Sequence, residues 1–90
     1  MFKNWIYFIR EIKKITGNAY IELKLTELDN FEIQINWFTD EGIYHFRKGL
    51  PIVFIENEDS EFEKHQLDNI IQDLIKFIKF NKIKCKPTTE

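Results

Sequence analysis

The apolar residues of this chain change their period twice, and that change most constrains the fold. From residue 2 to 15 they recur at helical spacing on one broad arc, and from residue 67 to 78 they do so again. Between these segments the period is two, as in strands that bury one face. The order predicts an α+β fold, in which an N-terminal and a C-terminal helix pack on one face of a three- to four-stranded antiparallel sheet.

The two helical segments have recognisable ends. Gly17 comes after the last periodic residue of the first helix, which two lysines precede, and it suits a left-handed C-terminal cap. The last helix is predicted to begin with a capping box of Ser60 and Glu63 and to run to about residue 82. The inward arc predicted for the first helix is Phe2, Trp5, Ile6, Phe8, Ile9, Ile12 and Ile15, with Tyr7 mostly outside it.

Two alternating segments, 20–26 and 31–38, predict a hairpin. A turn at 39–42 leads into a third strand at 43–48. Residues 52–55 are either a fourth short strand or an apolar crossover, because so short a run has no decisive period. The side chains predicted to point inward are Ile21, Leu23, Leu25, Phe31, Ile33, Ile35, Trp37, Tyr44 and Phe46.

The length of 90 residues supplies a single hydrophobic core. We therefore expect one domain over residues 1–84, followed by a flexible C-terminal tail at 85–90. The single cysteine, Cys85, has no intramolecular partner, which favours a reducing cytoplasm. We expect neither a secretory signal nor a transmembrane span, because charged residues interrupt the apolar ones near Met1 and the longest apolar run is far too short.

The sequence does not contain a recognisable set of catalytic residues, and we predict that the chain is not an enzyme. Cys85 lies in the predicted tail and Ser60 is explained as a helix cap, so neither is expected to act as a nucleophile. His45 is expected on the outer sheet face and His65 at a helix start, and neither has a second ligand at zinc spacing.

The acidic and glycine-containing segments do not match a known ligand loop either. The carboxylate pairs at 40–41 and 58–59 lie in turns, without an apolar pocket to raise a pKa for acid catalysis. The acidic run at 56–63 lacks the central glycine of a calcium loop, and three isolated glycines cannot cradle a phosphate. No cofactor and no metal are predicted.

Charge is distributed unevenly along the chain. Residues 27–63 carry ten acidic and two basic side chains, a net charge of −8, whereas the segments on either side are each +3. Two interpretations stay open: solvated turns and helix ends, or a surface that docks on a basic partner. The alternation also places Tyr20, Phe38 and Ile43 on the outer face. The candidate partner-binding residues are Asp29, Glu32, Phe38, Asp40, Glu41, Glu58 and Asp59.

A resemblance is carried by the helix string Ile9-Arg10-Glu11-Ile12-Lys13, three alternating strands, acidic turns and an acidic lead-in to the last helix. In this layout the chain resembles small helix-strand-strand-strand-helix proteins of phages and prophages of low-GC Gram-positive bacteria, a group that includes a Listeria prophage anti-CRISPR inhibitor of Cas9. The resemblance implies acidic side chains that mimic DNA phosphates and occupy a basic surface of a host nuclease. The residues that match in kind are Asp29, Asp40, Glu41, Glu58 and Asp59.

Two other functions stay open. Double-stranded RNA-binding domains share this element order, and a cluster of C-terminal lysines offers phosphate contacts. The net charge of −2 and an acidic helix start argue against nucleic acid as a partner. The lysines of that cluster, which belong to the nucleic-acid alternative, are Lys76, Lys79, Lys82, Lys84 and Lys86.

The other alternative is a small structural or oligomer-forming phage protein, although a monomer or weak homodimer is expected.

Overall fold

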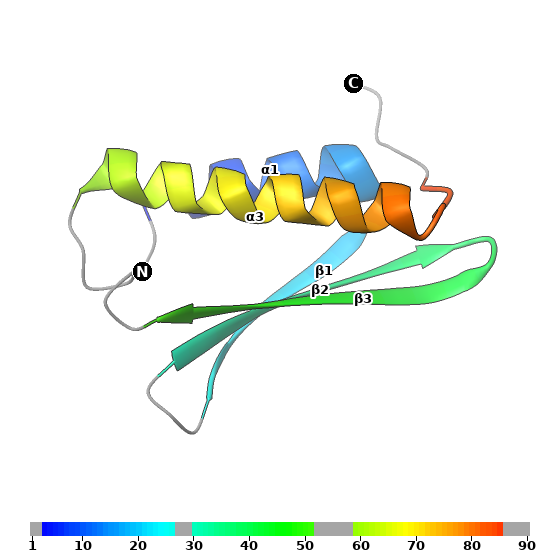
Figure 1. Ribbon diagram of the computed structural model, residues 1–90, viewed down its shortest axis with the longest axis horizontal. Helices are drawn as coiled ribbons and strands as arrows, with labels where there is room; N and C mark the ends of the chain where they lie inside the picture. The colour runs from blue at the N-terminus through cyan, green and yellow to red at the C-terminus, as the bar shows by residue number, and fades with distance from the viewer. Residues whose placement is uncertain (1–2, 27–29, 52–58, 86–90) are drawn as a thin grey trace.

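The computed structural model describes residues 3–26, 30–51 and 59–85, and it confirms the predicted α+β layout. Both helices lie on the same side of the sheet (Figure 1), so they cover one sheet face, and no described helix or strand covers the other. The predicted fourth strand falls on residues 52–55, which lie outside the described residues. In chain order the elements are α1 (Trp5–Thr16), β1 (Ala19–Leu25), β2 (Asn30–Thr39), β3 (Gly42–Pro51) and α3 (Ser60–Phe80).

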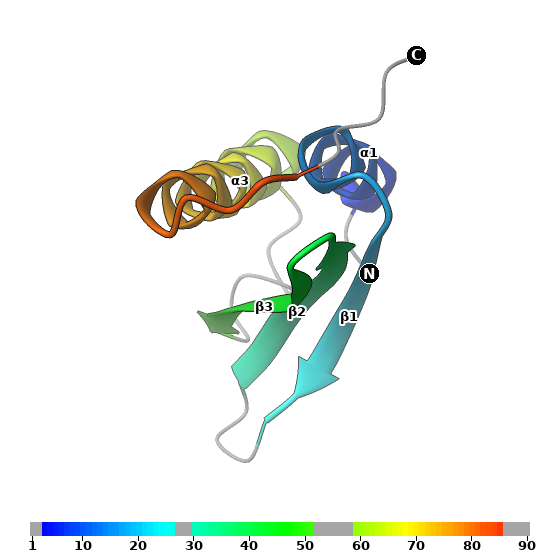
Figure 2. The same ribbon diagram turned by 90° about the vertical axis from the view of Figure 1, so that its right-hand side faces the viewer.

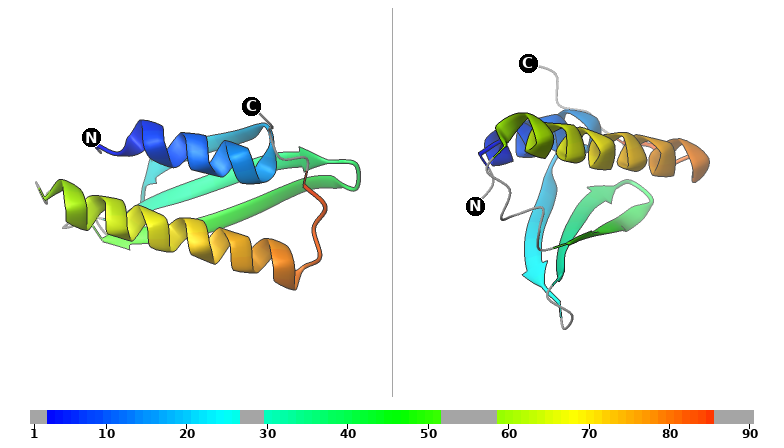
Figure 3. Two further views of the ribbon diagram at one scale, coloured as in Figure 1. Left: turned by 90° about the horizontal axis from the view of Figure 1, so that it is seen from above. Right: turned by 60° about the vertical axis from the view of Figure 1, so that its left-hand side comes forward.

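The sheet is antiparallel with the strand order β1-β2-β3, so β2 is central. Trp37 of β2 stands opposite Ala19 of β1 and opposite Tyr44 of β3. Figure 2 shows α1 above β1 and α3 above β3, and Figure 3 shows the two helices running side by side in the same direction. The two helices thus divide the covered face of the sheet between them.

The core lies between the sheet and the helices. The Trp37 ring is at the centre of an aromatic group, 5.9 Å from the Tyr44 ring and 6.4 Å from the Phe77 ring between centroids. Phe46 packs against Phe77 at 5.4 Å, so the predicted inward placement of Tyr44 and Phe46 is confirmed. The fully buried apolar side chains are Phe8, Ile12, Ile33, Ile35, Trp37, Leu67 and Leu74.

Two residues that were predicted to face the core are exposed instead. Ile6 is 66% exposed, because Tyr7 rather than Ile6 turns toward α3. Leu25 is also exposed. It is the last residue of β1, where the sheet twists away from both helices (Figure 2). A hydrophobic pattern predicts which face of a helix or strand is buried. It does not predict how far along that face the neighbouring helices or strands extend, because this depends on tertiary packing.

The C-terminal ends of the helices differ in how closely they follow the prediction. Gly17 ends α1 with a positive φ of 87°, and its N–H donates to the Lys13 carbonyl at 2.9 Å, as predicted for a glycine cap, but its ψ of −114° lies outside the left-handed helical region. The last helix ends at Phe80, slightly before the predicted position. Ile83 is buried and Cys85 packs partly against the core, so the packed chain extends one residue past the predicted domain boundary.

The predicted capping box at the start of α3 is wrong. The N-cap is Asp59, whose side chain accepts from the N–H groups of Glu61 and Phe62 at 3.0 and 3.2 Å. Ser60 is already the first helical residue, and the Glu63 carboxylate contacts α1 instead of its own helix. An aspartate suits the N-cap because its carboxylate both accepts these bonds and complements the positive end of the helix dipole.

A polar contact joins the two helices. The Tyr7 hydroxyl donates to Asp68 Oδ1 at 2.5 Å, and Lys64 Nζ lies 3.2 Å from Asp68 Oδ2 and 4.7 Å from the centroid of the Tyr7 ring. The hydrogen bond from Tyr7, followed by the contact with Lys64, holds the pKa of Asp68 below its usual value, although partial burial opposes this. The same hydrogen bond is the main reason that the pKa of Tyr7 is raised.

Replacing Tyr7 by phenylalanine is expected to lower the free energy of unfolding by about 1 kcal/mol at pH 7, since it removes a bond to a partly exposed carboxylate. The pKa of Asp68 is lowered in the folded state, so this contribution is present above about pH 4 and is lost as the pH falls further. Urea denaturation at pH 7 and at about pH 2.5 measures it. Tyr20→Phe, at an exposed tyrosine, is the control. An equal loss for Tyr7→Phe at both pH values would contradict the assignment.

Candidate functional site

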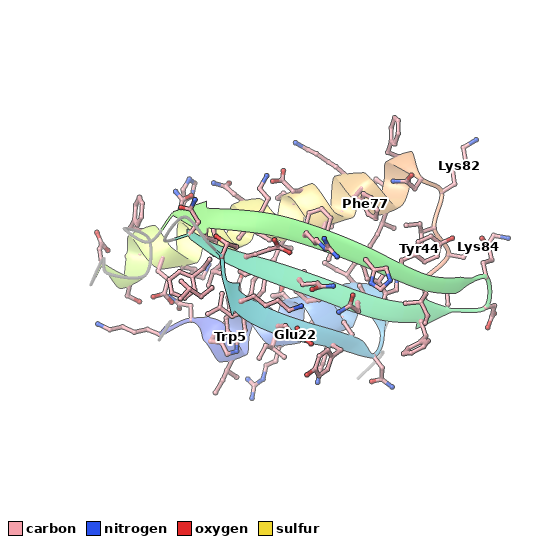
Figure 4. The ribbon with its side chains drawn as sticks, turned by 90° about the horizontal axis from the view of Figure 1, so that it is seen from below. Trp5, Glu22, Tyr44, Phe77, Lys82 and Lys84 are labelled. Atoms are coloured by element: carbon pink, nitrogen blue, oxygen red, sulfur yellow. The ribbon has the colours of Figure 1, made fainter. Side chains whose placement is uncertain are left out.

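The open face of the sheet consists of alternate side chains from all three strands, on the side away from both helices. Figure 4 looks onto this face, where Glu22 is labelled on β1. No described helix or strand covers it. Its members are Tyr20, Glu22 and Lys24 of β1, Glu32, Gln34, Asn36 and Phe38 of β2, and Ile43, His45 and Arg47 of β3.

Three apolar side chains adjoin one another at one corner of the open face. Tyr20, Phe38 and Ile43 are 64%, 73% and 53% exposed. Phe38 stands directly opposite Ile43, and Tyr20 stands opposite Asn36, the outward residue of β2 that precedes Phe38. Neighbours in these positions have Cβ atoms about 5 to 8 Å apart. We call these three residues the apolar corner, because together they form a patch rather than isolated exposed side chains.

The charged part of the open face is neutralised internally. Glu32 Oε1 lies 3.6 Å from Arg47 Nε, and Glu22 Oε2 lies 3.2 Å from Lys24 Nζ. Both pairs are at the surface, where such contacts contribute little to stability. Their effect is on the electrostatic character of the face: Glu32, a predicted site residue, does not present an isolated negative charge.

The hairpin turn between β2 and β3 adjoins the apolar corner. The Thr39 hydroxyl donates to the Gly42 carbonyl at 3.2 Å and accepts from the Glu41 N–H at 3.1 Å. Gly42 has a φ of 132°, which a residue with a side chain rarely adopts. This turn leaves the side chains of Asp40 and Glu41 exposed at the tip, with Tyr44 Oη 3.5 Å from Glu41 Oε2.

The predicted site residues do not form one surface. Phe38, Asp40 and Glu41 lie together at the hairpin end of the sheet, and Glu32 lies farther along the open face. Asp59 caps α3 at the other end of the molecule (Figure 1), where its carboxylate is already engaged. Two further candidates, Asp29 and Glu58, lie outside the described residues.

Tyr20 and Ile43 were not among the candidate site residues, yet they complete the apolar corner. Period-two alternation placed both on the open face. It did not show that they adjoin Phe38, because cross-strand proximity depends on the register between strands. The useful signal was an apolar residue at an outward position on each of three consecutive strands.

The potentially reactive side chains are scattered. His45 lies on the open face, as expected, and His65 lies on α3; both are exposed. Burial raises the pKa of the Cys85 thiol, and a weak interaction with the Trp37 indole partly offsets this. Within residues 3–26, 30–51 and 59–85, no three His, Cys, Asp or Glu side chains are grouped so that they could hold a metal ion.

Comparison with protein-family models, with curated proteins and with solved structures finds no match to this chain. Of the helices that the structure describes, neither is long and apolar enough to cross a membrane. The functional assignment therefore depends on the surface of this chain, in which the apolar corner and the hairpin turn are features that packing does not explain.

Proposed function

We propose that this chain is a non-catalytic protein-binding protein of a phage or mobile element, and that it docks on a host protein through the apolar corner and the adjoining hairpin turn. The apolar corner carries the proposal. Tyr20, Phe38 and Ile43 leave apolar surface in water on a sheet face that no described element covers. Aromatic residues are enriched at protein interfaces, and transferring one such side chain out of water contributes about 1.5–3 kcal/mol.

The arrangement also suggests the chemistry of the partner. Asp40 and Glu41 lie at the turn beside the apolar corner, while Glu32 farther along is paired with Arg47. A complementary surface would have an apolar pocket with basic groups at one side of its rim. The pocket would supply most of the affinity, and the basic rim would speed association and select the partner.

Inhibition of a host defence nuclease, such as a CRISPR nuclease, is the narrower form of this proposal. Its support is the layout resemblance and the exposed carboxylates of the hairpin turn. Nucleases that bind DNA have basic surfaces, to which acidic side chains can bind in place of phosphates. Of the described acidic residues that match in kind, Asp40 and Glu41 lie exposed at the hairpin turn, so they are the candidates for that role.

Phe38→Glu is expected to weaken partner binding by at least 30-fold, because it places a charge in the apolar pocket of the interface. The partner is identified by affinity capture from a host lysate with mass spectrometry, and its affinity is then measured with purified proteins. Ile6→Glu is the matched control, since Ile6 is similarly exposed but lies on α1. Both variants should retain wild-type stability. Equal binding by Phe38→Glu and the wild type would rule out the apolar corner.

The narrower form has its own assay. Excess protein should inhibit DNA cleavage by a susceptible Cas9, and the double variant Asp40→Lys, Glu41→Lys should inhibit less. Undiminished cleavage across Cas9 orthologues from low-GC bacteria would exclude nuclease inhibition of this kind. The capture experiment would still decide the broader proposal, because it does not depend on the identity of the partner.

A further inference from the structure

The C-terminal end of α3 is a second exposed surface, with a different composition. Phe80 is 87% exposed, more than any other large apolar side chain that the structure describes. Lys76 precedes it by one helical turn, so the two lie on the same side of α3. We call the surface formed by Lys76, Lys79, Phe80, Lys82 and Lys84 the basic end, and all five of these side chains are exposed.

The lysines of the basic end differ from most of the cations elsewhere in the described chain. Five other cations each lie within 4.0 Å of a carboxylate, in the pairs Lys14–Glu11, Lys24–Glu22, Arg47–Glu32, Lys48–Asp73 and Lys64–Asp68. Within the described residues, no lysine of the basic end has such a partner. The helix dipole does not account for them, because its C-terminal end is equivalent to only about half a negative charge. Most of the positive charge at this end is therefore uncompensated.

The backbone at Lys82 gives a separate indication. The N–H of Ile83 donates to the Ile78 carbonyl and the N–H of Lys82 to the Lys79 carbonyl, at 3.0 and 3.2 Å, which is the bonding of a Schellman cap. Lys82 occupies the left-handed position of that cap with a φ of 53°, where glycine is strongly preferred. A strained lysine at a position suited to glycine favours a role for its charge over a role in stability.

We propose that the basic end binds single-stranded nucleic acid, with the lysines contacting phosphates and the Phe80 ring stacking on an unpaired base. Lysine is an effective point-charge ligand for phosphate, and a base stacks on any exposed aromatic ring whatever its identity. The basic end lies on α3 and the residues that follow it, whereas the apolar corner lies on the sheet, so the proposal does not depend on the proposed protein partner.

Three other anionic partners fit less well. A duplex offers phosphates but no unpaired base for Phe80. An acidic protein is disfavoured because lysine is depleted at protein interfaces. A flat anionic membrane would also meet the acidic turn of Asp40 and Glu41, since Lys84 lies beside the end of the β2–β3 hairpin (Figure 4). A narrow flexible strand can contact the lysines and avoid those carboxylates.

Binding of a fluorescein-labelled oligothymidylate, measured by anisotropy at about 50 mM salt, tests the proposal. Phe80→Ala should weaken binding roughly 5- to 100-fold without changing the salt dependence. Phe38→Ala, at the exposed aromatic of the apolar corner, should leave binding unchanged. Lys79→Gln should lower the slope of log affinity against log salt by about 0.7, and Arg10→Gln, at an exposed cation on α1, should not.

Lys82→Gly separates binding from folding, because it should raise the urea midpoint of unfolding while lowering affinity and salt slope. Four results would overturn the proposal: no binding at 50 mM salt, no effect of Phe80→Ala, a matched duplex bound as tightly, or polyglutamate or phosphatidylserine vesicles bound more tightly. The protein-partner proposal would be unaffected by any of these, since its test uses Phe38→Glu.

Discussion

Trp37→Ala is expected to cost about 3–5 kcal/mol of the free energy of unfolding, the usual range for truncating a large buried aromatic side chain. Trp37 is fully buried and packs against Tyr44 and Phe77, so its removal leaves a cavity where strand β3 and helix α3 meet. A domain of this size has a total stability of about 5–13 kcal/mol. The loss is therefore a large fraction of the total stability, and the urea midpoint of unfolding should fall accordingly, as measured by far-UV circular dichroism.

Two further variants separate the contributions at this position. Trp5→Ala removes a half-buried tryptophan stacked on Phe8 and should cost roughly half as much. Trp37→Phe leaves a smaller cavity than Trp37→Ala. It also removes the buried indole N–H, which makes no hydrogen bond of normal geometry among the described residues and interacts only weakly with Cys85. It should cost about 1–2 kcal/mol. If Trp37→Ala cost no more than Trp5→Ala, the aromatic group would not be the centre of the core.

Much of the sheet could be predicted from the sequence because a period of two assigns each residue to a face without reference to the rest of the fold. Ile33, Ile35 and Trp37 are buried as expected for that reason. Lys48 shows the limit of such reasoning. It stands opposite Ile33 and so points to the covered face, where its ammonium group lies 2.8 Å from Asp73 of α3. That contact depends on how α3 crosses the sheet, which local sequence does not encode.

The candidate site was predictable in part for similar reasons. Phe38 could be placed on the open face from the alternation alone, and Asp40 and Glu41 from the turn signal around Gly42. The neutralisation of Glu32 by Arg47 depends on the register of β2 and β3. The acidic block of the sequence therefore overstated the acidic surface, because nearness in sequence does not determine which charges are paired in space.

Glu63 is the clearest case in which sequence identified an important residue but not its partner. It is a charged side chain with only 5% exposure, on the first turns of α3. Its Oε1 accepts the backbone N–H of Asn4 at 2.6 Å, and the Asn4 side chain donates to the Ser60 carbonyl at 3.0 Å. Asn4 is the N-cap of α1 and makes no side-chain hydrogen bond to its own helix. The first turn of α3 thus supplies a cap to α1 across the helix interface.

Glu63→Ala is expected to lower the free energy of unfolding by about 2–3 kcal/mol, because it leaves the Asn4 N–H without its charged acceptor. Glu63→Gln keeps an acceptor oxygen and should cost about 1 kcal/mol. Glu61→Ala, at an exposed carboxylate in the same turn, should cost less than about 0.5 kcal/mol. Urea denaturation measures all three, and amide hydrogen exchange should show that Asn4 loses protection only in the Glu63 variants. Rapid exchange at Asn4 in the wild type would mean that Glu63 is buried for another reason.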